Sequence, residues 1–592
     1  MPARHGGGLA EPRRGTLRHA LGVQAPALPD AGSAIRRLRQ DTFVVSGASS
    51  TEATVPQAPL RGLPPSERTL AALLRRQAER HGAKPFVTAA GGERRSYAEL
   101  GVAAGRWGAL LGEIGVGRGD RVAAITGNRI ELLELLLGCA SIGAVAVPLN
   151  PAIRGAQLQH ALTNSAAGTL IIETEHLDAL ARVPPPATLA HVWLLDRERP
   201  HRAHGYRCEP LPALGGSVGQ AALEPGDTVA IFYVPGRDGA ARGVLCPNAQ
   251  LYWWGILGSE FVRITEEDVC LAALPLFSAA AIDSFCQALV AGAEWVITPR
   301  FAPARHWSTA AEHRATRTHL HGSMAATLLA APPSRDDTAH TVTIAQAPPT
   351  DAAVLEAFEE RFGVELCCGY STTETGRITS VPGEPRRPGS PGRALALGRA
   401  LDEFELAVVD EDDAIVADGE AGELVVRPRH PFSTTSGYHR MPELTVRAWR
   451  NLWLHTGDRV VRDADGWYSL VETATDAISR HGEEVSSFEV ERALGEHPAV
   501  AAAAVFAVRS QEGEEEVMAA VVLGPGAECD PLELVQFLEP RIAGFSIPRY
   551  VEFVATLPVG GDGSVRKREL SAHGPSDEAW DRERSGYRLA RR

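Results

Sequence analysis

Short apolar stretches alternate with helical patterns over several hundred residues, and this alternation constrains the fold more than any other feature. From Thr69 to about residue 470, such stretches recur between segments whose apolar residues are spaced three and four apart. Clear examples are Val122–Ile125, Thr169–Ile172, Val229–Phe232 and Trp295–Ile297. Stretches of this length between helices are typical of buried strands, so we expect an α/β domain.

Two later regions have a different pattern. Glu405–Val409 and Glu423–Val426 lie close together in the chain, which indicates a small antiparallel unit within the same domain. After residue 476 the pattern predicts a helix, two strands and a second helix, over Ser487–Leu494, Ala501–Val508, Val517–Leu523 and Pro531–Leu538. A small α+β C-terminal domain of about 100 residues follows, which is an ordinary domain size.

Size and composition exclude several classes of protein. A chain of 592 residues is too long for one core, so at least two domains are expected. The net charge of −14 argues against a nucleic-acid-binding protein, which would be expected to carry excess positive charge. No run of eighteen apolar residues exists to span a membrane. The eight cysteines form no metal-ligand spacing and are expected to be reduced. Without the apolar segment of a signal peptide, a cytoplasmic location is expected.

The sequence also predicts domain boundaries. Residues 1–61 are rich in Gly, Pro and Arg and indicate a disordered arm, although a wrongly assigned start codon explains them equally well. The large domain is expected over 62–471, a hinge over 472–476 and the small domain over 477–575. The polar residues 576–592 are expected to form a frayed tail.

A set of motifs in a fixed order indicates a family. They are Gly119–Val122, Gly143–Pro151, Gly369–Glu374, Gly422–Leu424, Gly437–Tyr438 with Pro442–Glu443, and Trp453–Asp458. Together they resemble the adenylate-forming superfamily of acyl-CoA synthetases, non-ribosomal adenylation domains and firefly luciferase, over roughly residues 65–575. Leu274–Phe277 and Arg361–Val364 look most like carnitine/crotonobetaine-CoA ligases and related acyl-CoA ligases.

The resemblance implies ATP and Mg²⁺ as cofactors, with the acyl group of an acyl-adenylate handed to a thiol such as that of coenzyme A. By position, Tyr370 contacts adenine, Asp458 binds the ribose diol and Glu374 holds Mg²⁺, with the Thr373 hydroxyl near the α-phosphate. A hard cation takes oxygen ligands and keeps waters, so one glutamate beside phosphates is sufficient. The alternative is that these residues are remnants of an ancestral site.

The phosphate loop departs from the family pattern Tyr-Thr-Ser-Gly-Thr-Thr-Gly-x-Pro-Lys-Gly. Here Tyr233–Gly243 keeps Gly236 and Gly239, whose backbone N–H groups can surround an anion, but loses the hydroxyls. Arg242 replaces the lysine and keeps its charge, and Arg237 offers a further donor. Such an Arg-for-Lys exchange fits the whole chain, in which only Lys84 and Lys567 are lysines.

The small domain departs further. Relatives carry a lysine that bridges the carboxylate and the α-phosphate, and the aligned residue here is Ser564. Lys567 is the candidate to replace it, although neighbours along a helix or strand point to other faces. His481 replaces a glycine in the loop that lines the pantetheine passage, where it would narrow the passage or carry protons; a plain surface histidine is the alternative.

The acyl side is altered as well. Ser278 stands where an aromatic residue or histidine usually follows Pro-Leu-Phe. The Gly-Gly-Ala that floors the acyl tunnel appears as Ala345–Ala347, so that Gln346 and Ala347 line the pocket. A glutamine in that floor shortens the tunnel and makes it polar, which argues against a long fatty acyl substrate.

Three functions fit these departures. The first is a diverged ATP-dependent ligase that activates a small or polar carboxylate, or another small acid, and transfers it to a thiol or amine. The second is a repurposed adenylating enzyme, for example one that activates nitrite for N–N bond formation in natural-product biosynthesis. The third is a non-catalytic binding or scaffold homologue. A homodimer and a carrier-protein partner are both compatible with the resemblance.

Overall fold

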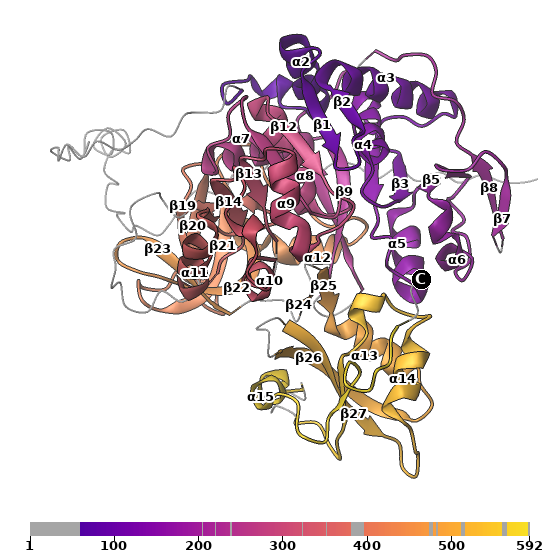
Figure 1. Ribbon diagram of the computed structural model, residues 1–592, viewed down its shortest axis with the longest axis vertical. Helices are drawn as coiled ribbons and strands as arrows, with labels where there is room; N and C mark the ends of the chain where they lie inside the picture. Colours follow the sequence, from indigo (N-terminus) through magenta and orange to yellow (C-terminus); the bar gives the residue numbers. More distant parts are fainter. Residues whose placement is uncertain are drawn as a thin grey trace, which may run out of the picture. The chain divides into compact units, whose positions relative to one another are not determined.

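The computed structural model describes residues 60–203, 205–219, 221–236, 240–321, 324–350, 352–380, 396–472, 477–480, 483–510, 515–558 and 565–589. Within them the chain forms a large domain of α/β sheets with an antiparallel unit and a small α+β domain, which confirms the predicted fold class (Figure 1). The expected arm (residues 1–61) lies outside these ranges except for Leu60 and Arg61. The expected hinge lies outside them except for Glu472, so its position stays a prediction.

Two largely parallel sheets form the centre of the large domain. The first, in spatial order, is β15 (Glu365–Cys368), β14 (Ile344–Ala347), β13 (Arg317–His319), β11 (Val269–Ala272), β12 (Glu294–Ile297), β1 (Pro85–Ala89) and β2 (Arg94–Ser96). The second is β10 (Arg242–Pro247), β9 (Thr228–Val234), β4 (Val145–Pro148), β3 (Arg121–Ile125), β5 (Thr169–Ile172), β6 (His191–Leu194), β8 (Tyr206–Pro210) and β7 (His201–Ala203). All four strands predicted from apolar stretches are present in these sheets.

The third sheet of the large domain is antiparallel. In spatial order it contains β18 (Thr379–Ser380), β19 (Ala396–Ala400), β23 (Trp467–Glu472), β22 (Leu454–Arg462), β21 (Ala421–Pro428) and β20 (Phe404–Val409). The predicted pairing of the two hydrophobic segments is the β20–β21 ladder, in which Ala407 lies opposite Val425.

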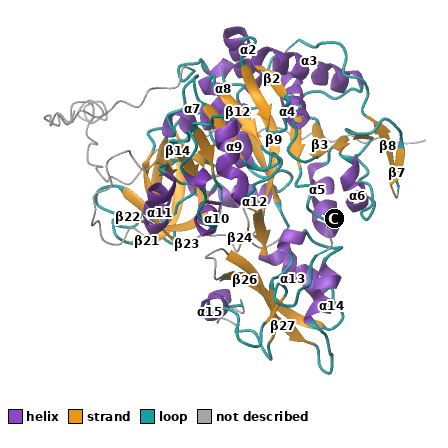
Figure 2. Ribbon diagram, in the orientation of Figure 1, coloured by secondary structure: helices purple, strands orange, loops and turns teal. Residues whose placement is uncertain are grey.

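Helices cover the sheets (Figure 2). They are α2 (Leu70–His81), α3 (Tyr97–Glu113), α4 (Ile130–Ile142), α5 (Gly155–Ser165), α6 (Leu177–Leu180), α7 (Asn248–Phe261), α8 (Ala279–Ala291), α9 (His306–Glu312), α10 (Met324–Ala330), α11 (Ala352–Phe362) and α12 (Pro442–Ala448). Local signals set their ends: Ser96 caps α3 in a capping box with Glu99, and Gly143 ends α4 in the left-handed conformation.

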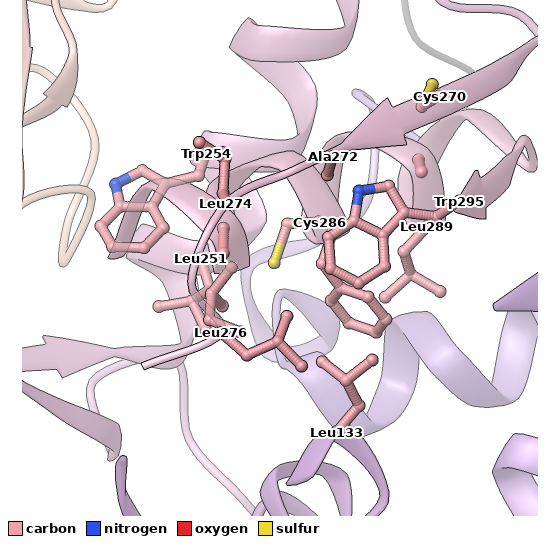
Figure 3. Packing of buried hydrophobic residues seen from close by; sticks show 14 of the residues in the cluster. Leu133, Leu251, Trp254, Cys270, Ala272, Leu274, Leu276, Cys286, Leu289 and Trp295 are labelled. Carbon is pink, nitrogen blue, oxygen red and sulfur yellow. The ribbon is translucent and has the colours of Figure 1, made fainter. Parts of the chain in front are cut away.

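The alternation of side chains along β3 separates two cores. Val122 and Ala124 belong to the main cluster, which includes residues of α2, α3, α4, α7 and α8 and of both parallel sheets. Ala123 and Ile125 point to the other face, where α5 and α6 cover the second sheet. Figure 3 shows part of the main cluster, with Trp254 of α7, Cys286 of α8 and Trp295 of β12.

The small domain has a four-stranded sheet, β26–β27–β28–β29, with helices on both faces, and a separate two-stranded sheet, β24–β25. Its elements are β24 (Ala477–Arg480), β25 (Glu483–Ser486), α13 (Ser487–Gly495), β26 (Val500–Arg509), β27 (Glu515–Leu523), α14 (Pro531–Leu538), β28 (Tyr550–Phe553), α15 (Lys567–His573) and β29 (Trp580–Asp581). Val505 and Ala519 pack with α13 and α14, whereas Phe506 and Met518 face Leu570 of α15. The helix-strand-strand-helix order was predicted correctly.

The expectation of a frayed tail is wrong for residues 576–589. Trp580–Asp581 forms β29, which pairs with β28, and Asp581 and Arg582 are buried. Arg549 contacts both Asp581 and Glu516 at 3.4 Å, and Glu516 also pairs with Arg480 at 2.7 Å. Polar composition misled the prediction because these charges are paired inside the small domain rather than solvated.

All eight cysteines are free thiols, as expected. Among the described residues no helix is long and apolar enough to cross a membrane.

Two buried histidines make the large domain sensitive to acid. Burial lowers the pKa of His306 to about 4 and that of His319 to about 3. Between these values and the ordinary pKa near 6.5, the unfolded chain binds more protons than the folded chain, so stability falls as the pH decreases. We expect the thermal unfolding midpoint to drop between pH 7.5 and pH 5, with each histidine contributing up to about 1.4 kcal/mol per pH unit.

The matched variants are His306→Leu and His573→Leu, the second at an exposed histidine. The first should flatten the dependence of the midpoint on pH, and the second should leave it unchanged. An unaltered slope in His306→Leu would contradict this account.

Candidate active site

A tight hairpin carries two of the predicted catalytic residues, Thr373 and Glu374, and directly follows Tyr370. Its strands are β16 (Ser371–Thr372) and β17 (Gly376–Arg377), which follow directly after β15. The hydroxyls of Thr372 and Thr375 lie 3.0 Å apart and brace the turn. Gly376 has φ +66°, a conformation that favours glycine. The hairpin therefore holds Thr373 and Glu374 at a turn fixed by its own backbone.

Tyr370, in the loop between β15 and β16, and Asp458, on β22, are brought together. The Tyr370 hydroxyl donates to Asp458 Oδ2 at 2.5 Å, although the two residues are 88 positions apart. Tyr370 is buried, and burial together with the Asp458 charge raises the pKa of its phenol. The hydrogen bond ties the carboxylate of β22 to the aromatic ring, so a ligand that reaches one residue also reaches the other.

Glu374 is oriented by neighbours on three segments. Tyr438 donates its hydroxyl to Glu374 Oε1 at 2.9 Å, and the Gln250 amide donates to the carbonyls of Thr373 and Glu374 at 2.9 and 3.0 Å. Burial raises the pKa of Glu374, and the Tyr438 hydrogen bond and the charge of Arg242 oppose that shift. The second oxygen of Glu374 suits a hard cation that takes oxygen ligands.

The phosphate loop begins where β9 ends. Gly236 is buried there, whereas Arg237 and Gly239 lie outside the described residues. Arg242 opens β10, and its guanidinium carbon lies 5.7 Å from the centre of the Tyr438 ring. Arg242, Tyr438 and Glu374 thus form a line from the end of the loop to the predicted cation ligand.

The predicted catalytic groups of the small domain are not all described. His481 and Ser564 lie outside the described residues. Lys567 is described, and its Nζ lies 2.7 Å from Ser487 Oγ and 2.9 Å from Glu491 Oε1. The lysine is therefore held by α13 of its own domain, and its role in catalysis stays a prediction.

The predicted acyl-pocket residues have distinct surroundings. Ser278 caps α8: its hydroxyl accepts from the Ala281 N–H at 3.3 Å and donates to the Pro275 carbonyl at 2.7 Å. Gln346 and the buried Ala347 lie on β14, and their role as the floor of an acyl pocket stays a prediction. Gln346 accepts from His319 Nε2 at 3.0 Å and from Gln287 at 3.2 Å, so its surroundings are polar.

Sequence reasoning missed three polar residues of this floor. They are Asp283 of α8, His319 of β13 and Arg377 of β17, and each is electrostatically coupled to at least one of the others. A signal was available for two of them, since a lone aspartate in an apolar helix and an arginine directly after the Thr-Glu-Thr-Gly turn are both unusual. Their convergence depends on the arrangement of strands and could not be read from spacing.

Comparisons with known proteins identify the family. The model described as AMP-binding enzyme matches residues 74–439, and the model described as AMP-binding enzyme C-terminal domain matches residues 489–563. The chain belongs to the AMP-binding enzyme family. Its fold is thus that of the adenylate-forming enzymes, as the motifs predicted.

Three relatives illustrate which members of the family this chain is similar to. Crotonobetaine/carnitine–CoA ligase of Salmonella typhi is 28% identical over 485 residues, which is 80% of this chain and 92% of the ligase. The amide bond synthetase McbA from Marinactinospora thermotolerans is 26% identical with a TM-score of 0.74, covering 85% of this chain and 99% of McbA. ATP-bound MatB from Rhodopseudomonas palustris is also 26% identical, with a TM-score of 0.59 over 85% and 98% of the two chains.

The hairpin yields a test of local geometry. A Cβ at Gly376 would lie 2.4 Å from Trp254, and the residue also has positive φ. Gly363 is the matched control, because it has φ +67° but nothing within 4 Å of its Cβ position. We expect Gly376→Ala to lower the free energy of unfolding by at least about 1 kcal/mol more than Gly363→Ala, since overpacking adds to strain. Equal losses in chemical denaturation would show that Trp254 simply moves aside.

Proposed function

We propose that this chain is a diverged ATP-dependent ligase that activates a small or polar carboxylic acid as an acyl-adenylate and transfers it to a thiol or amine. The observation that carries the proposal is the convergence of Tyr370, Glu374 and Asp458, which come from a hairpin and a distant strand. An aromatic ring, a diol-binding carboxylate and a cation-binding carboxylate are what a nucleotide and its metal require. The polar floor at Gln346 supports a small or polar acid.

In the proposed reaction, each residue of the site has a separate role in binding. Glu374 would hold Mg²⁺ and is aligned by the Tyr438 hydroxyl, while Asp458 would accept hydrogen bonds from the ribose. A bound triphosphate would supply the electrophilic phosphorus and the pyrophosphate leaving group, and Mg²⁺ would supply charge stabilisation. Arg242 places a positive charge where the family has a lysine, and Thr373 lies at the turn beside Glu374. Positioning and charge, rather than covalent chemistry, are the contributions of this chain.

The relatives support both kinds of acceptor. The crotonobetaine/carnitine ligase is named for transfer to coenzyme A, and McbA is named for making amide bonds. We therefore keep thiol and amine acceptors together, with coenzyme A as the first thiol to test. A carrier protein and a homodimer belong to the same proposal and are not needed for the adenylation step.

Asp458 provides the first functional test. Asp458→Ala should abolish ATP binding in calorimetry, because the ribose diol loses its acceptor and the Tyr370 hydroxyl loses its partner, at about 1–3 kcal/mol each. Asp402→Ala, at an exposed residue before β20, is the control and should bind like the unaltered protein. Unaltered affinity in Asp458→Ala would refute the nucleotide assignment.

Ser564 provides the second test, because a hydroxyl stands where the family has a cation beside the α-phosphate. We expect carboxylate-dependent pyrophosphate exchange at least about 10²-fold below that of typical relatives, on the scale of a lost transition-state donor. Ser564→Lys should raise the exchange rate. Transfer from preformed acyl-adenylate should change less, because that step does not use this residue.

Lys567→Ala separates the two lysine positions. Ordinary exchange in the unaltered protein that is lost in Lys567→Ala would mean that Lys567 leaves Ser487 and Glu491 to serve the reaction. AMP formation from nitrite alone would favour the repurposed enzyme. Absence of nucleotide binding would favour the scaffold homologue.

A further inference from the structure

Four elements of the large domain direct polar side chains to one place at the acyl end of the site. Helix α8 contributes Asp283 and Gln287, β13 contributes His319, β14 contributes Gln346 and β17 contributes Arg377. Gln287, His319 and Arg377 are buried, in a region whose other neighbours are largely apolar. So many polar groups in a core carry a cost unless each is satisfied.

The hydrogen bonds around His319 have a fixed direction. Trp295 Nε1 donates to Ser284 Oγ at 2.9 Å, so the serine hydroxyl is free to donate to His319 Nδ1 at 3.0 Å. His319 Nε2 faces the amide oxygens of Gln287 and Gln346, both at 3.0 Å, and must therefore carry the proton. The Gln287 amide nitrogen donates to Gln346 Oε1 at 3.2 Å, and both glutamine side chains oppose the rise in the pKa of Asp283 that burial causes.

Arg377 has hydrogen-bond donors without acceptors. It is 4% exposed, and its Nε and Nη1 have no hydrogen-bond partner in the structure. The guanidinium carbon lies 3.9 Å from the centre of the Phe261 ring, and Nη1 occupies the space that a side chain at position 369 would fill. Among the described residues no carboxylate lies within ion-pair distance of Arg377, although Asp283 attracts it from further away. A buried cation with open donors is costly unless an anion completes it.

We propose that Arg377 binds the second carboxylate of a short dicarboxylic acid whose other carboxylate is the one activated. This inference rests on the proposed ligase function and names the substrate class. A guanidinium only donates hydrogen bonds and matches the planar, two-oxygen geometry of a carboxylate. The Gln346 floor restricts the length, which favours diacids of about four to six carbons.

Asp283 separates this proposal from a zwitterionic substrate. An ammonium group would pair with the Asp283 carboxylate, but burial raises the pKa of this carboxyl group to about 6 and so disfavours the charged form that such a pair needs. The unmet hydrogen-bonding groups are donors, on Arg377, rather than acceptors. The geometry therefore favours an added anion over an added cation.

The test is calorimetric binding to the full chain, with and without saturating AMP, so that no turnover is required. The probes are succinate, glutarate and adipate, each matched with the monocarboxylic acid of equal length: butyrate, pentanoate and hexanoate. We expect at least one diacid to bind 10-fold or more tightly than its partner. Equal affinities, tighter monoacids or no binding of any acid would overturn the inference.

Variants locate the preference. Arg377→Met should erase it, and Arg377→Lys should retain only part, because a lysine keeps the charge without the paired donors. Asp283→Asn removes the competing anion and should strengthen diacid binding. Arg399→Met, on β19 over Trp467, is the control and should keep the preference. If Arg377→Met does not fold, Arg377→Lys and Asp283→Asn still decide, since both retain a polar group of similar size.

The failures are distinguishable. A diacid preference that keeps its full strength in Arg377→Lys would overturn the assignment to Arg377. The same conclusion would follow if the protein bound glutamate more tightly than glutarate and Asp283→Asn removed that difference. Pyrophosphate exchange with monoacids and no diacid preference would refute the inference while the ligase function stands. Arg377-dependent diacid binding without pyrophosphate exchange would support this site while the ligase function fails.

Discussion

The β16–β17 hairpin is the constraint on which both halves of the site depend. Its turn presents Glu374 toward Tyr438 and the phosphate loop, and the strand that leaves the turn carries Arg377 toward the acyl floor. Only Gly376 separates Arg377 from the turn, with its positive φ and its contact with Trp254. Each strand of the hairpin is only two residues long, so a shift in its register would move both Glu374 and Arg377.

Charge is distributed differently in the two halves. On the nucleotide side the acids are present and aligned, while the phosphate loop has lost the hydroxyls of its relatives. On the side predicted to bind the acyl group, the buried cation Arg377 lies near the polar cluster of Gln346 and His319. Binding of a diacid would bring negative charge to Arg377, a buried cation with no carboxylate at ion-pair distance among the described residues, so substrate recognition would also balance charge in this part of the core.

Much of the fold could be predicted from the sequence because its signals are local. Apolar stretches identified the strands of the parallel sheets, and the helix-strand-strand-helix order identified the small domain. The ordered motifs also placed Tyr370, Glu374 and Asp458 in one site, and the structure brings them together. The tail was predicted wrongly, because pairing of Asp581 with Arg549 depends on a distant strand.

The acyl floor could not be predicted for the same reason. Gln346 was recognised from its position in a motif, but His319, Asp283 and Arg377 meet only through the order of strands in the first sheet. Ser278 was predicted to line the acyl pocket, but its hydroxyl forms the hydrogen bonds that cap α8. Ser278 belongs to a motif, yet its hydroxyl is used in the hydrogen bonds of a helix cap. Arg377 belongs to no motif, yet it is a buried side chain with unsatisfied hydrogen-bond donors.

The proposed weakness of adenylation and the proposed recognition of a second carboxylate are physically connected. The resemblance aligns Ser564 with the lysine of the family, and Arg377 would not replace that lysine because it would hold the far end of the same substrate. Remote contacts still contribute to rate, since binding energy away from the reacting atoms holds the attacking carboxylate in place. Loss of such a contact lowers the turnover number as well as the affinity. In this site, then, orientation by Arg377 would take over part of the role that a positioned lysine has in the relatives, and the second carboxylate would matter to the chemistry and not only to selection.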